Sequence, residues 1–441
     1  MRERNTLADN LAAAFLAGAW SRKALLHRGA QAGGGDRRQL GPLVRIILER
    51  FPAPAPRPDA GVLARLIAAQ FGPDPAVTFD LPRRIYWPAP HMAPAAGPPS
   101  TWHVPPLPTT AAVAEWLGIS HGELDWFADC QGREARTPDG PPRHYTYHWL
   151  KGRHGKQRLL EAPKRLLKAI QRRVLHEILG HVTPHGAAHG FRPGRSIATY
   201  AAPHAAKRIV LRFDLRAFFP SIRASRVHAL FRTAGYPHDV ARVLTGLCTN
   251  RVPDEVWRQL PADEQARCEK ATDRLLYRRP HLPRGAPTSP ALANLCAFRL
   301  DCRLDALARS LNAAYTRYAD DLAFSGGEDL ERGARRFQVL ACRISMEHGF
   351  TLHTRKSRFM RQGVRQQLAG VVVNAHPNVR REEYNRLKAI LTNCVRHGPA
   401  SQNRDGHADF RCHLAGRVAY VGMLNPARGR QLRALFDGIQ W

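Results

Sequence analysis

Apolar residues recur at helical and strand-like spacings along much of the chain. Between residues 165 and 179 they return every three or four positions, which predicts an amphipathic helix with basic residues on its other face. The apolar members of this pattern are Leu166, Leu167, Ile170, Val174, Leu175, Ile178 and Leu179. Residues 11–20 predict a second amphipathic helix near the N-terminus. The apolar run 209–213 predicts a strand that ends at Asp214.

The second half of the chain continues to alternate between the two spacings. It predicts a helix from Pro290, a hairpin over residues 315–325 with Asp320 and Asp321 at its turn, and a strand over residues 368–374. A mostly helical C-terminus follows. This mixture of helices with a few strands is typical of an α+β protein.

Residues 111–129 predict two short helices around a turn at 118–120, a pattern similar to a helix-turn-helix. DNA binding by this pair is one alternative. The segment is acidic, and acidic side chains repel phosphate, so a packing role is favoured. Its acidic residues are Glu115, Glu123, Asp125 and Asp129.

The N-terminal third differs in composition from the rest of the chain. Fifteen of the 34 prolines lie between Pro52 and Pro108. Proline at this density prevents long helices and central strands, so we expect extended connectors around a few short elements. We therefore interpret residues 1–140 as an extension that is mainly helical and proline-rich.

The 441 residues include 67 Lys and Arg against 36 Asp and Glu, a formal net charge of +31. A hydrophobic content of 44% excludes a fully disordered basic tail, and a folded protein this basic usually binds a polyanion such as nucleic acid. Residues 1–150 contribute only +3, residues 151–235 contribute +15 and residues 236–441 contribute +13. The charge that favours nucleic acid therefore lies after residue 150.

The chain has no run of 18 apolar residues, so we expect no membrane partner. Its eight cysteines contain no CxxC pair, which favours free thiols and a cytoplasmic location. Two groups of residues resemble metal ligands. Pro184 and Gly186 interrupt any helix that would align the first group, and the spacing of the second matches no common zinc finger. The two groups are His181, His185 and His189, and Cys394, His397, His407 and Cys412.

Three aspartates stand out in the basic part of the chain. Asp214 ends a predicted strand, and Asp320 and Asp321 follow about a hundred residues later. Carboxylates at strand ends in a positive surface suit two magnesium ions that catalyse phosphoryl transfer on nucleic acid. An Asp-Asp pair alone is more often a solvated turn. The order strand-Asp, Pro-x-Gly-x-x-x-Ser-Pro and Tyr-x-Asp-Asp is far more specific.

These segments resemble the catalytic motifs of reverse transcriptases. Residues 213–222 resemble the first catalytic motif, residues 282–290 the template- and nucleotide-positioning loop, and residues 318–321 the YxDD metal motif. The match runs in the expected order from about residue 145 to the C-terminus. Within this superfamily, residues 155–163, 189–196 and 315–321 resemble bacterial retron reverse transcriptases. Two retron motifs are altered, with Tyr200 in place of Asn and Ala369 in place of Thr.

The resemblance implies an α+β right-hand polymerase. Fingers and a palm with an antiparallel sheet would occupy residues 141–375, and a helical thumb residues 376–441, after the extension 1–140. It implies an RNA-directed DNA polymerase that copies a cognate structured noncoding RNA into branched, RNA-linked cDNA from dNTPs. It also implies an antiphage role with a separate effector protein. The alternatives are a non-retron bacterial defence reverse transcriptase, a group II intron-like enzyme and a non-catalytic RNA-binding protein.

The resemblance also assigns roles to individual residues. Asp214, Asp320 and Asp321 would hold two Mg²⁺ ions. The residues expected to bind the nucleotide are Arg158, Phe219, Arg284, Gly285 and Lys356, with Phe219 crowding a ribose 2′-hydroxyl. Those expected to contact primer or template are Tyr318, His204 and Gly370. An arginine-rich thumb would hold the template–primer duplex through its backbone.

Overall fold

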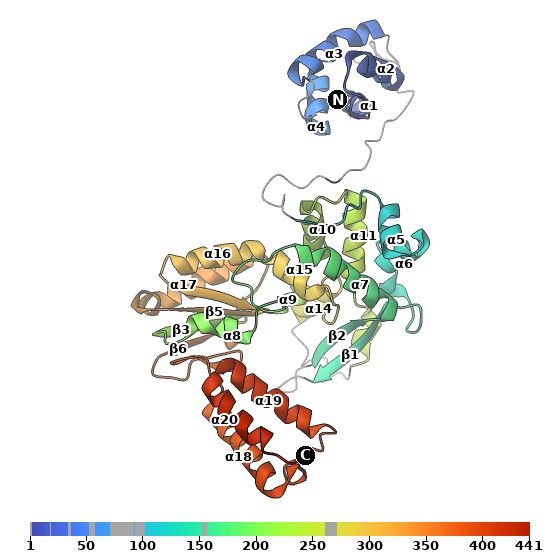
Figure 1. Cartoon of the computed structure of the whole chain (residues 1–441). Helices are drawn as coiled ribbons and strands as arrows, with labels where there is room; N and C mark the ends of the chain where they lie inside the picture. Colours follow the sequence, from blue (N-terminus) through green and yellow to red (C-terminus); the bar gives the residue numbers. More distant parts are fainter. Residues whose placement is uncertain are drawn as a thin grey trace. The chain divides into compact units, whose positions relative to one another are not determined.

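The structure is a computed structural model that describes residues 2–17, 19–33, 37–52, 58–70, 92, 102–151, 157–260 and 271–441 (Figure 1). Most of the proline-rich stretch expected to form connectors, and the first two residues of the 155–163 motif, lie outside the described residues. The chain forms two compact units, Met1–His91 and Met92–Trp441. We describe each unit by itself.

The first unit is a small group of helices around its own apolar core. It contains α1 (Arg2–Leu16), α2 (Arg22–Gly33), α3 (Arg37–Arg50) and α4 (Ala60–Gln70), with α1 packed on α2 and α4. Leu11, Phe15 and Val44 are fully buried in this core. The predicted N-terminal helix is confirmed, although it ends at Leu16 instead of continuing to Trp20.

The second unit begins with the two short helices predicted over residues 111–129. They are α5 (Thr110–Leu117) and α6 (His121–Ala128), and Ser120 caps α6 through a reciprocal pair of hydrogen bonds with Glu123. Val113 and Phe127 are buried in the same core as α11 (His238–Cys248). Their apolar faces are therefore covered by the protein itself, as the packing interpretation expected.

A two-stranded hairpin and a long helix follow. Strand β1 (Tyr145–Lys151) pairs antiparallel with β2 (Gln157–Pro163), and α7 (Arg165–Glu177) confirms the predicted amphipathic helix. Leu167 and Val174 of α7 are buried, but Leu166 is 65% exposed. The expectation for Leu166 was wrong because consecutive helical residues point about 100° apart, so Leu166 and Leu167 cannot share one face.

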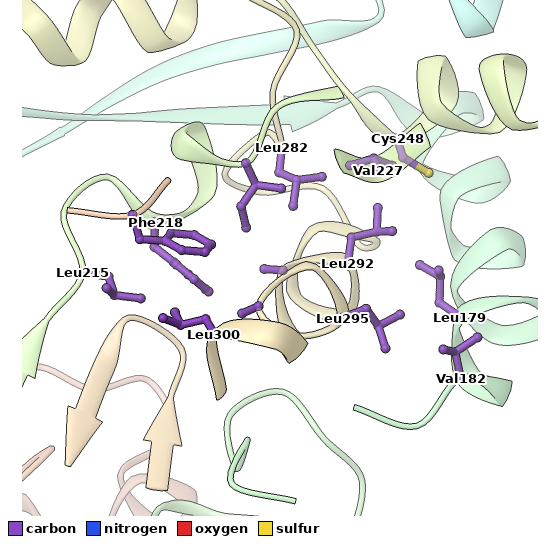
Figure 2. Close-up of a cluster of buried hydrophobic side chains, with 14 of the residues drawn as sticks. Leu179, Val182, Leu215, Phe218, Val227, Cys248, Leu282, Leu292, Leu295 and Leu300 are labelled. Carbon is purple, nitrogen blue, oxygen red and sulfur yellow. The ribbon is translucent and has the colours of Figure 1, made fainter. Parts of the chain in front are cut away.

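This unit contains α15 (Ser289–Cys296), which starts next to Pro290 as predicted, and further helices. They are α8 (Ile197–Ala201), α9 (Phe218–Ser221), α10 (Ala224–Thr233), α12 (Asp254–Arg258), α14 (Ala271–Tyr277) and α16 (Phe298–Arg309). Figure 2 shows Leu292 and Leu295 of α15 among side chains from segments far apart in the sequence, such as Val182 and Leu282. This helix is therefore at the centre of the largest apolar core.

An antiparallel sheet forms the other half of this unit. Its strands β3 (Ile209–Asp214), β4 (Ala314–Tyr318), β5 (Asp321–Gly326) and β6 (Arg358–Arg361) lie in the order β4-β5-β3-β6. Helices α16 and α17 (Glu328–Glu347) cover one face (Figure 1). Leu211 and Phe213 point into the core on that face, whereas Val210 joins a second core on the other. The predicted strand and hairpin are confirmed.

The segment predicted as one strand over residues 368–374 is a tight hairpin instead. Strands β7 (Gln367–Leu368) and β8 (Val371–Val372) pair around Ala369 and Gly370, whose φ angles are 44° and 93°. Two consecutive residues with positive φ reverse the chain, and an apolar pattern does not reveal this.

The C-terminus is helical, as predicted. Helices α18 (Arg381–His397), α19 (Phe410–Leu424) and α20 (Pro426–Asp437) bury Leu391, Leu414 and Leu432 in the second core, which they share with Val210 and Ala323 of the sheet. No described helix is both long and apolar enough to cross a membrane.

The contact between α6 and α11 tests this packing. A Cβ atom on Gly246 of α11 would lie 1.9 Å from the backbone oxygen of Ala128. We expect Gly246→Ala to lower the free energy of unfolding by about 3 kcal/mol, because the backbone of α6 must move. Gly416→Ala in α19 is the control, since its Cβ meets nothing within 4 Å and should stabilise by up to about 1 kcal/mol. Urea denaturation that ranks the two variants equally would contradict the contact.

Candidate active site

Strand pairing brings the three aspartates to one edge of the sheet. Asp214, the last residue of β3, is directly opposite Asp321, the first residue of β5. Tyr318 is opposite Asp321 on the other side, so Ala319 and Asp320 form the two-residue turn between β4 and β5. The backbone N–H of Leu215 donates to the Asp320 carbonyl at 2.8 Å. The sequence prediction that these residues meet is consistent with this register.

Burial and the neighbouring negative charges disfavour ionisation of Asp320 and Asp321. Burial raises the pKa of Asp320, and the nearby charge of Asp214 raises it further. Burial also raises the pKa of Asp321 to about 6, although the guanidinium of Arg212 acts in the opposite direction. Positive charge at this edge therefore favours the ionised forms of Asp320 and Asp321.

Two basic side chains supply part of that charge. The amine of Lys356 donates to both carboxylate oxygens of Asp214, at 2.8 and 2.9 Å. Arg212 Nε lies 2.8 and 2.9 Å from the two oxygens of Asp321. No comparable contact to the Asp320 carboxylate exists among the described residues. Lys356, one of the expected nucleotide-binding residues, thus lies directly beside the aspartates.

The donor set suits a hard divalent cation, because it consists of carboxylate oxygens whose repulsion such an ion would relieve. Within the described part of the chain, no three His, Cys, Asp or Glu side chains converge closely enough to hold a metal ion as they stand. Asp214 and Asp321 would therefore exchange their basic partners for metal. The histidine group and the cysteine–histidine group noted in the sequence likewise do not converge closely enough to hold a metal ion.

A fully buried arginine anchors the hairpin that carries two of the aspartates. Arg317 Nη2 and Nε contact the two carboxylate oxygens of Asp301 on α16, at 2.6 and 2.8 Å. Its Nη1 reaches the side-chain oxygen of Asn294 on α15 and the Ala319 carbonyl, at 3.0 and 3.2 Å. Tyr315 donates to Asp301 as well. The turn is thereby fixed to the helices beneath the sheet.

The loop before α15 brings a further basic residue to the site. The guanidinium of Arg284 is close enough to lower the pKa of Asp320. The next residue, Gly285, has a φ of 126°, and a Cβ there would lie 2.8 Å from the Glu161 carbonyl oxygen. The Glu161 amide donates to the Arg284 carbonyl at 2.8 Å. Glycine is thus required for this loop to pair with β2.

A buried polar cluster under this loop holds it in place. The fully buried carboxylate of Glu161 accepts from Asn250 Nδ2 at 2.8 Å and lies 3.1 Å from Nε2 of His281. Burial alone would lower the pKa of His281, but the Glu161 carboxylate outweighs it and the pKa is raised. Three chain segments meet at this one carboxylate.

The remaining expected site residues lie at different depths. Phe219 on α9 is half-buried, with its ring 5.6 Å from that of Phe218. Tyr318 is also half-buried, 5.7 Å from the ring of Tyr200. Arg158 is exposed on β2, and Gly370 is exposed in the β7–β8 turn. These last two lie outside the hydrogen-bond network of the aspartates.

His204 requires a correction. It was expected to contact RNA, but its side chain has no exposed surface. Its ring nitrogens lie 2.7 Å from Ser325 Oγ and 2.7 Å from Thr316 Oγ1, so it links β5 to β4. Burial lowers its pKa to about 3. A neutral histidine satisfied on both sides inside the protein has a structural role, not a recognition role.

Sequence reasoning missed Arg212, Glu161 and Arg317. Arg212 precedes Asp214 by two residues on one strand, so both side chains lie on the same face. That spacing could have indicated that Arg212 lies on the face of Asp214, where Asp321, its partner, is opposite Asp214. Glu161 is one of only three acidic residues in 151–235, which is itself a signal. Nothing local distinguishes Arg317, because Asp301 lies on another element.

Comparisons with known proteins agree with this geometry. Residues 150–384 match the family model of reverse transcriptases, RNA-dependent DNA polymerases. The retron Mx65 reverse transcriptase of Myxococcus xanthus is 41% identical over 328 residues, covering 74% of this chain and 70% of the relative. The retron Mx162 reverse transcriptase of the same organism is 35% identical over 74% of this chain and 66% of the relative. The retron Ec86 reverse transcriptase of Escherichia coli is 31% identical over 58% of this chain and 70% of the relative.

The chain is thus an RNA-directed DNA polymerase, and its sheet and aspartate edge lie within the matched residues. The chain belongs to the bacterial retron-type reverse transcriptases. The expected α+β polymerase fold is confirmed, and catalysis in this family depends on divalent metal ions. The same family membership supports RNA and complementary DNA as its nucleic-acid partners.

The raised pKa of Asp321 predicts how metal-free stability depends on pH. A carboxyl with a pKa of about 6 in the folded state and 3.8 unfolded binds protons more tightly when folded. Its contribution to stability is therefore present below pH 4 and is lost as pH rises to 6. With EDTA present, we expect Asp321→Asn to abolish this loss. Between pH 4 and pH 7 the free energy of unfolding should therefore fall by up to about 3 kcal/mol less in the variant than in the wild type.

Urea denaturation at both pH values measures this difference. Asp239→Asn is the control, because Asp239 on α11 has a 73% exposed side chain. Parallel pH profiles for wild type and Asp321→Asn would contradict the predicted linkage.

Proposed function

We propose that this chain copies RNA into DNA by two-metal nucleotidyl transfer, with Asp214, Asp320 and Asp321 holding two Mg²⁺ ions. The register that places Asp214 opposite Asp321 and next to the Asp320 turn is the observation that carries the proposal. Such ions, when bound, activate the primer hydroxyl and neutralise charge on the departing pyrophosphate. The strongly basic chain after residue 150 supplies the surface for the nucleic-acid backbone.

The chain's own residues would orient the nucleotide. Lys356, half-exposed beside Asp214, can reach the phosphates once the carboxylate is otherwise neutralised. Arg284 lies near Asp320, where a guanidinium suits phosphate oxygens. We assign Arg158 and the backbone at Gly285 to the same triphosphate.

The sugar and the primer would be contacted by side chains around the aspartates. Phe219, five residues after Asp214, would crowd a ribose 2′-hydroxyl and so favour dNTPs. Tyr318 would contact the primer end, and Gly370 the primer or template strand. We further propose that residues 141–375 act as fingers and palm and residues 376–441 as a thumb on the duplex, behind an extension over residues 1–140.

We also propose that the template is a structured noncoding RNA, that the product is branched RNA-linked cDNA, and that the enzyme serves antiphage defence with a separate effector protein. The relatives named as retron reverse transcriptases support this. The alternative is a defence reverse transcriptase without a retron RNA, or less favourably a group II intron-like enzyme. The altered positions Tyr200 and Ala369 keep that alternative open.

The aspartates can be tested by removing two of them. We expect Asp320→Ala with Asp321→Ala to reduce dNTP incorporation on a primed RNA template by about a thousandfold or more, because the charges that hold the metals are lost. RNA binding should change little, since it depends on basic residues elsewhere. Primer extension and filter binding measure the two properties, with Asp239→Asn as a control for loss of an exposed carboxylate. Incorporation that survives the double substitution would exclude these residues as the metal ligands.

The retron assignment is tested by the nucleic acid that co-purifies with the protein. We expect cDNA joined to RNA through a 2′,5′ linkage. RNase treatment should shorten the RNA part of this molecule without freeing the cDNA from its last ribonucleotide, whereas debranching enzyme should free the cDNA. Complementary DNA without such a branch would favour the non-retron alternative, while leaving polymerase activity intact.

A further inference from the structure

Phe191 combines a strained backbone with an exposed aromatic ring. Its φ is 58°, in the left-handed region that bulky side chains rarely adopt, and the residue is 51% exposed. It belongs to none of the apolar clusters formed by the described residues. Apolar burial therefore does not account for a phenylalanine in this conformation, and such outliers concentrate at functional sites.

The backbone before Phe191 is attached to the catalytic hairpin. The His189 amide donates to the Arg317 carbonyl at 2.8 Å, and Asn294 Nδ2 donates to the Gly190 carbonyl at 2.8 Å. A Cβ on Gly190 would lie 2.8 Å from the Ala319 nitrogen, next to Asp320. The position of Phe191 is therefore fixed relative to the turn that carries Asp320.

The ring of Phe191 lies between two other aromatic residues of the site. Its centroid is 6.3 Å from that of Phe219 and 6.3 Å from that of Tyr318. Those two rings pack at the margins of two different apolar cores, whereas Phe191 leaves half of its surface free. Three separate segments thus place a row of rings beside the aspartates.

The surroundings of this row are basic. Burial lowers the pKa of His189 to about 4, and the positive charges of Arg195 and Arg192 contribute to the shift, so both guanidinium groups lie near this segment. Exposed aromatic rings among arginines suit a nucleotide, whose sugar and base stack on the rings while its phosphates meet the cations.

We propose that Phe191 contacts the sugar and base of the incoming deoxynucleotide alongside Phe219, and that it thereby helps to select deoxyribose over ribose. The inference rests on the proposed polymerase function of the aspartate edge. Phe191 touches substrate through its ring alone, so the ring can be removed without disturbing the anchored backbone.

Phe191→Gly tests this directly, because glycine accepts a φ of 58° and relieves the strain while deleting the ring. On an RNA template with a DNA primer that next requires adenine, we expect the KM for dATP to rise about tenfold with kcat changed less than about threefold. The preference for dATP over ATP in kcat/KM should fall at least about fivefold. Phe191→Tyr, which keeps the ring, should resemble the wild type.

Trp126→Ala is the matched control, since Trp126 is a 45% exposed aromatic residue on α6 and should leave all these values unchanged. Phe191→Gly should unfold at the same urea concentration as the wild type or a higher one. An unchanged KM and sugar preference would overturn the proposal. A loss of stability together with a general loss of kcat would also overturn it. Weaker template–primer binding with an unchanged KM for dATP would overturn it as well. A wild-type protein that does not incorporate dATP would instead contradict the proposed function itself.

Discussion

Strand pairing forces three carboxylates into one partly buried edge, where they repel one another and lose contact with water. Because Asp214 and Asp321 are directly opposite in the sheet, they cannot separate without breaking the β3–β5 pairing. Burial, and after it the charge of Asp214, raises the pKa of Asp320, since repulsion is strong in a medium of low polarity. Protonation or nearby positive charge relieves this repulsion. Lys356 and Arg212 provide this charge in the protein itself, and divalent metal ions would provide it during catalysis.

The same edge has to stay rigid, and the buried Arg317 explains how it does. Its ion pair with Asp301 has no exposed surface on either side chain. Breaking such a pair by removing one partner costs about 3–5 kcal/mol, because the other charge stays buried. The arginine also bonds the Ala319 carbonyl, while its own backbone bonds Ala187 and His189. One residue therefore couples the turn that carries Asp320, the helices below it and the segment that presents Phe191.

The sheet itself is stabilised from both faces. Alternate residues of β3 and β5 point into two separate cores, one beneath α16 and α17 and one shared with the C-terminal helices. Each core packs against one face of the same strands. A register shift of one residue would therefore turn the apolar side chains of each face toward the wrong core and would displace Asp214 from Asp321. The apolar cores and the aspartate pairing thus depend on a single register.

The sequence by itself determined the elements and the order of the motifs, because periodicity, proline positions and turn residues are local properties. The strand ending at Asp214, the hairpin at Asp320 and the helix after Pro290 follow from such local patterns. Local patterns failed where a backbone reversal interrupts an apolar run, as at Ala369, and where two leucines adjoin in α7. The tertiary structure alone decided which charges meet. Arg317 finds Asp301, Glu161 finds His281, and His204 lies between two strands, since each partner is distant in sequence and only chain folding brings it within bonding distance.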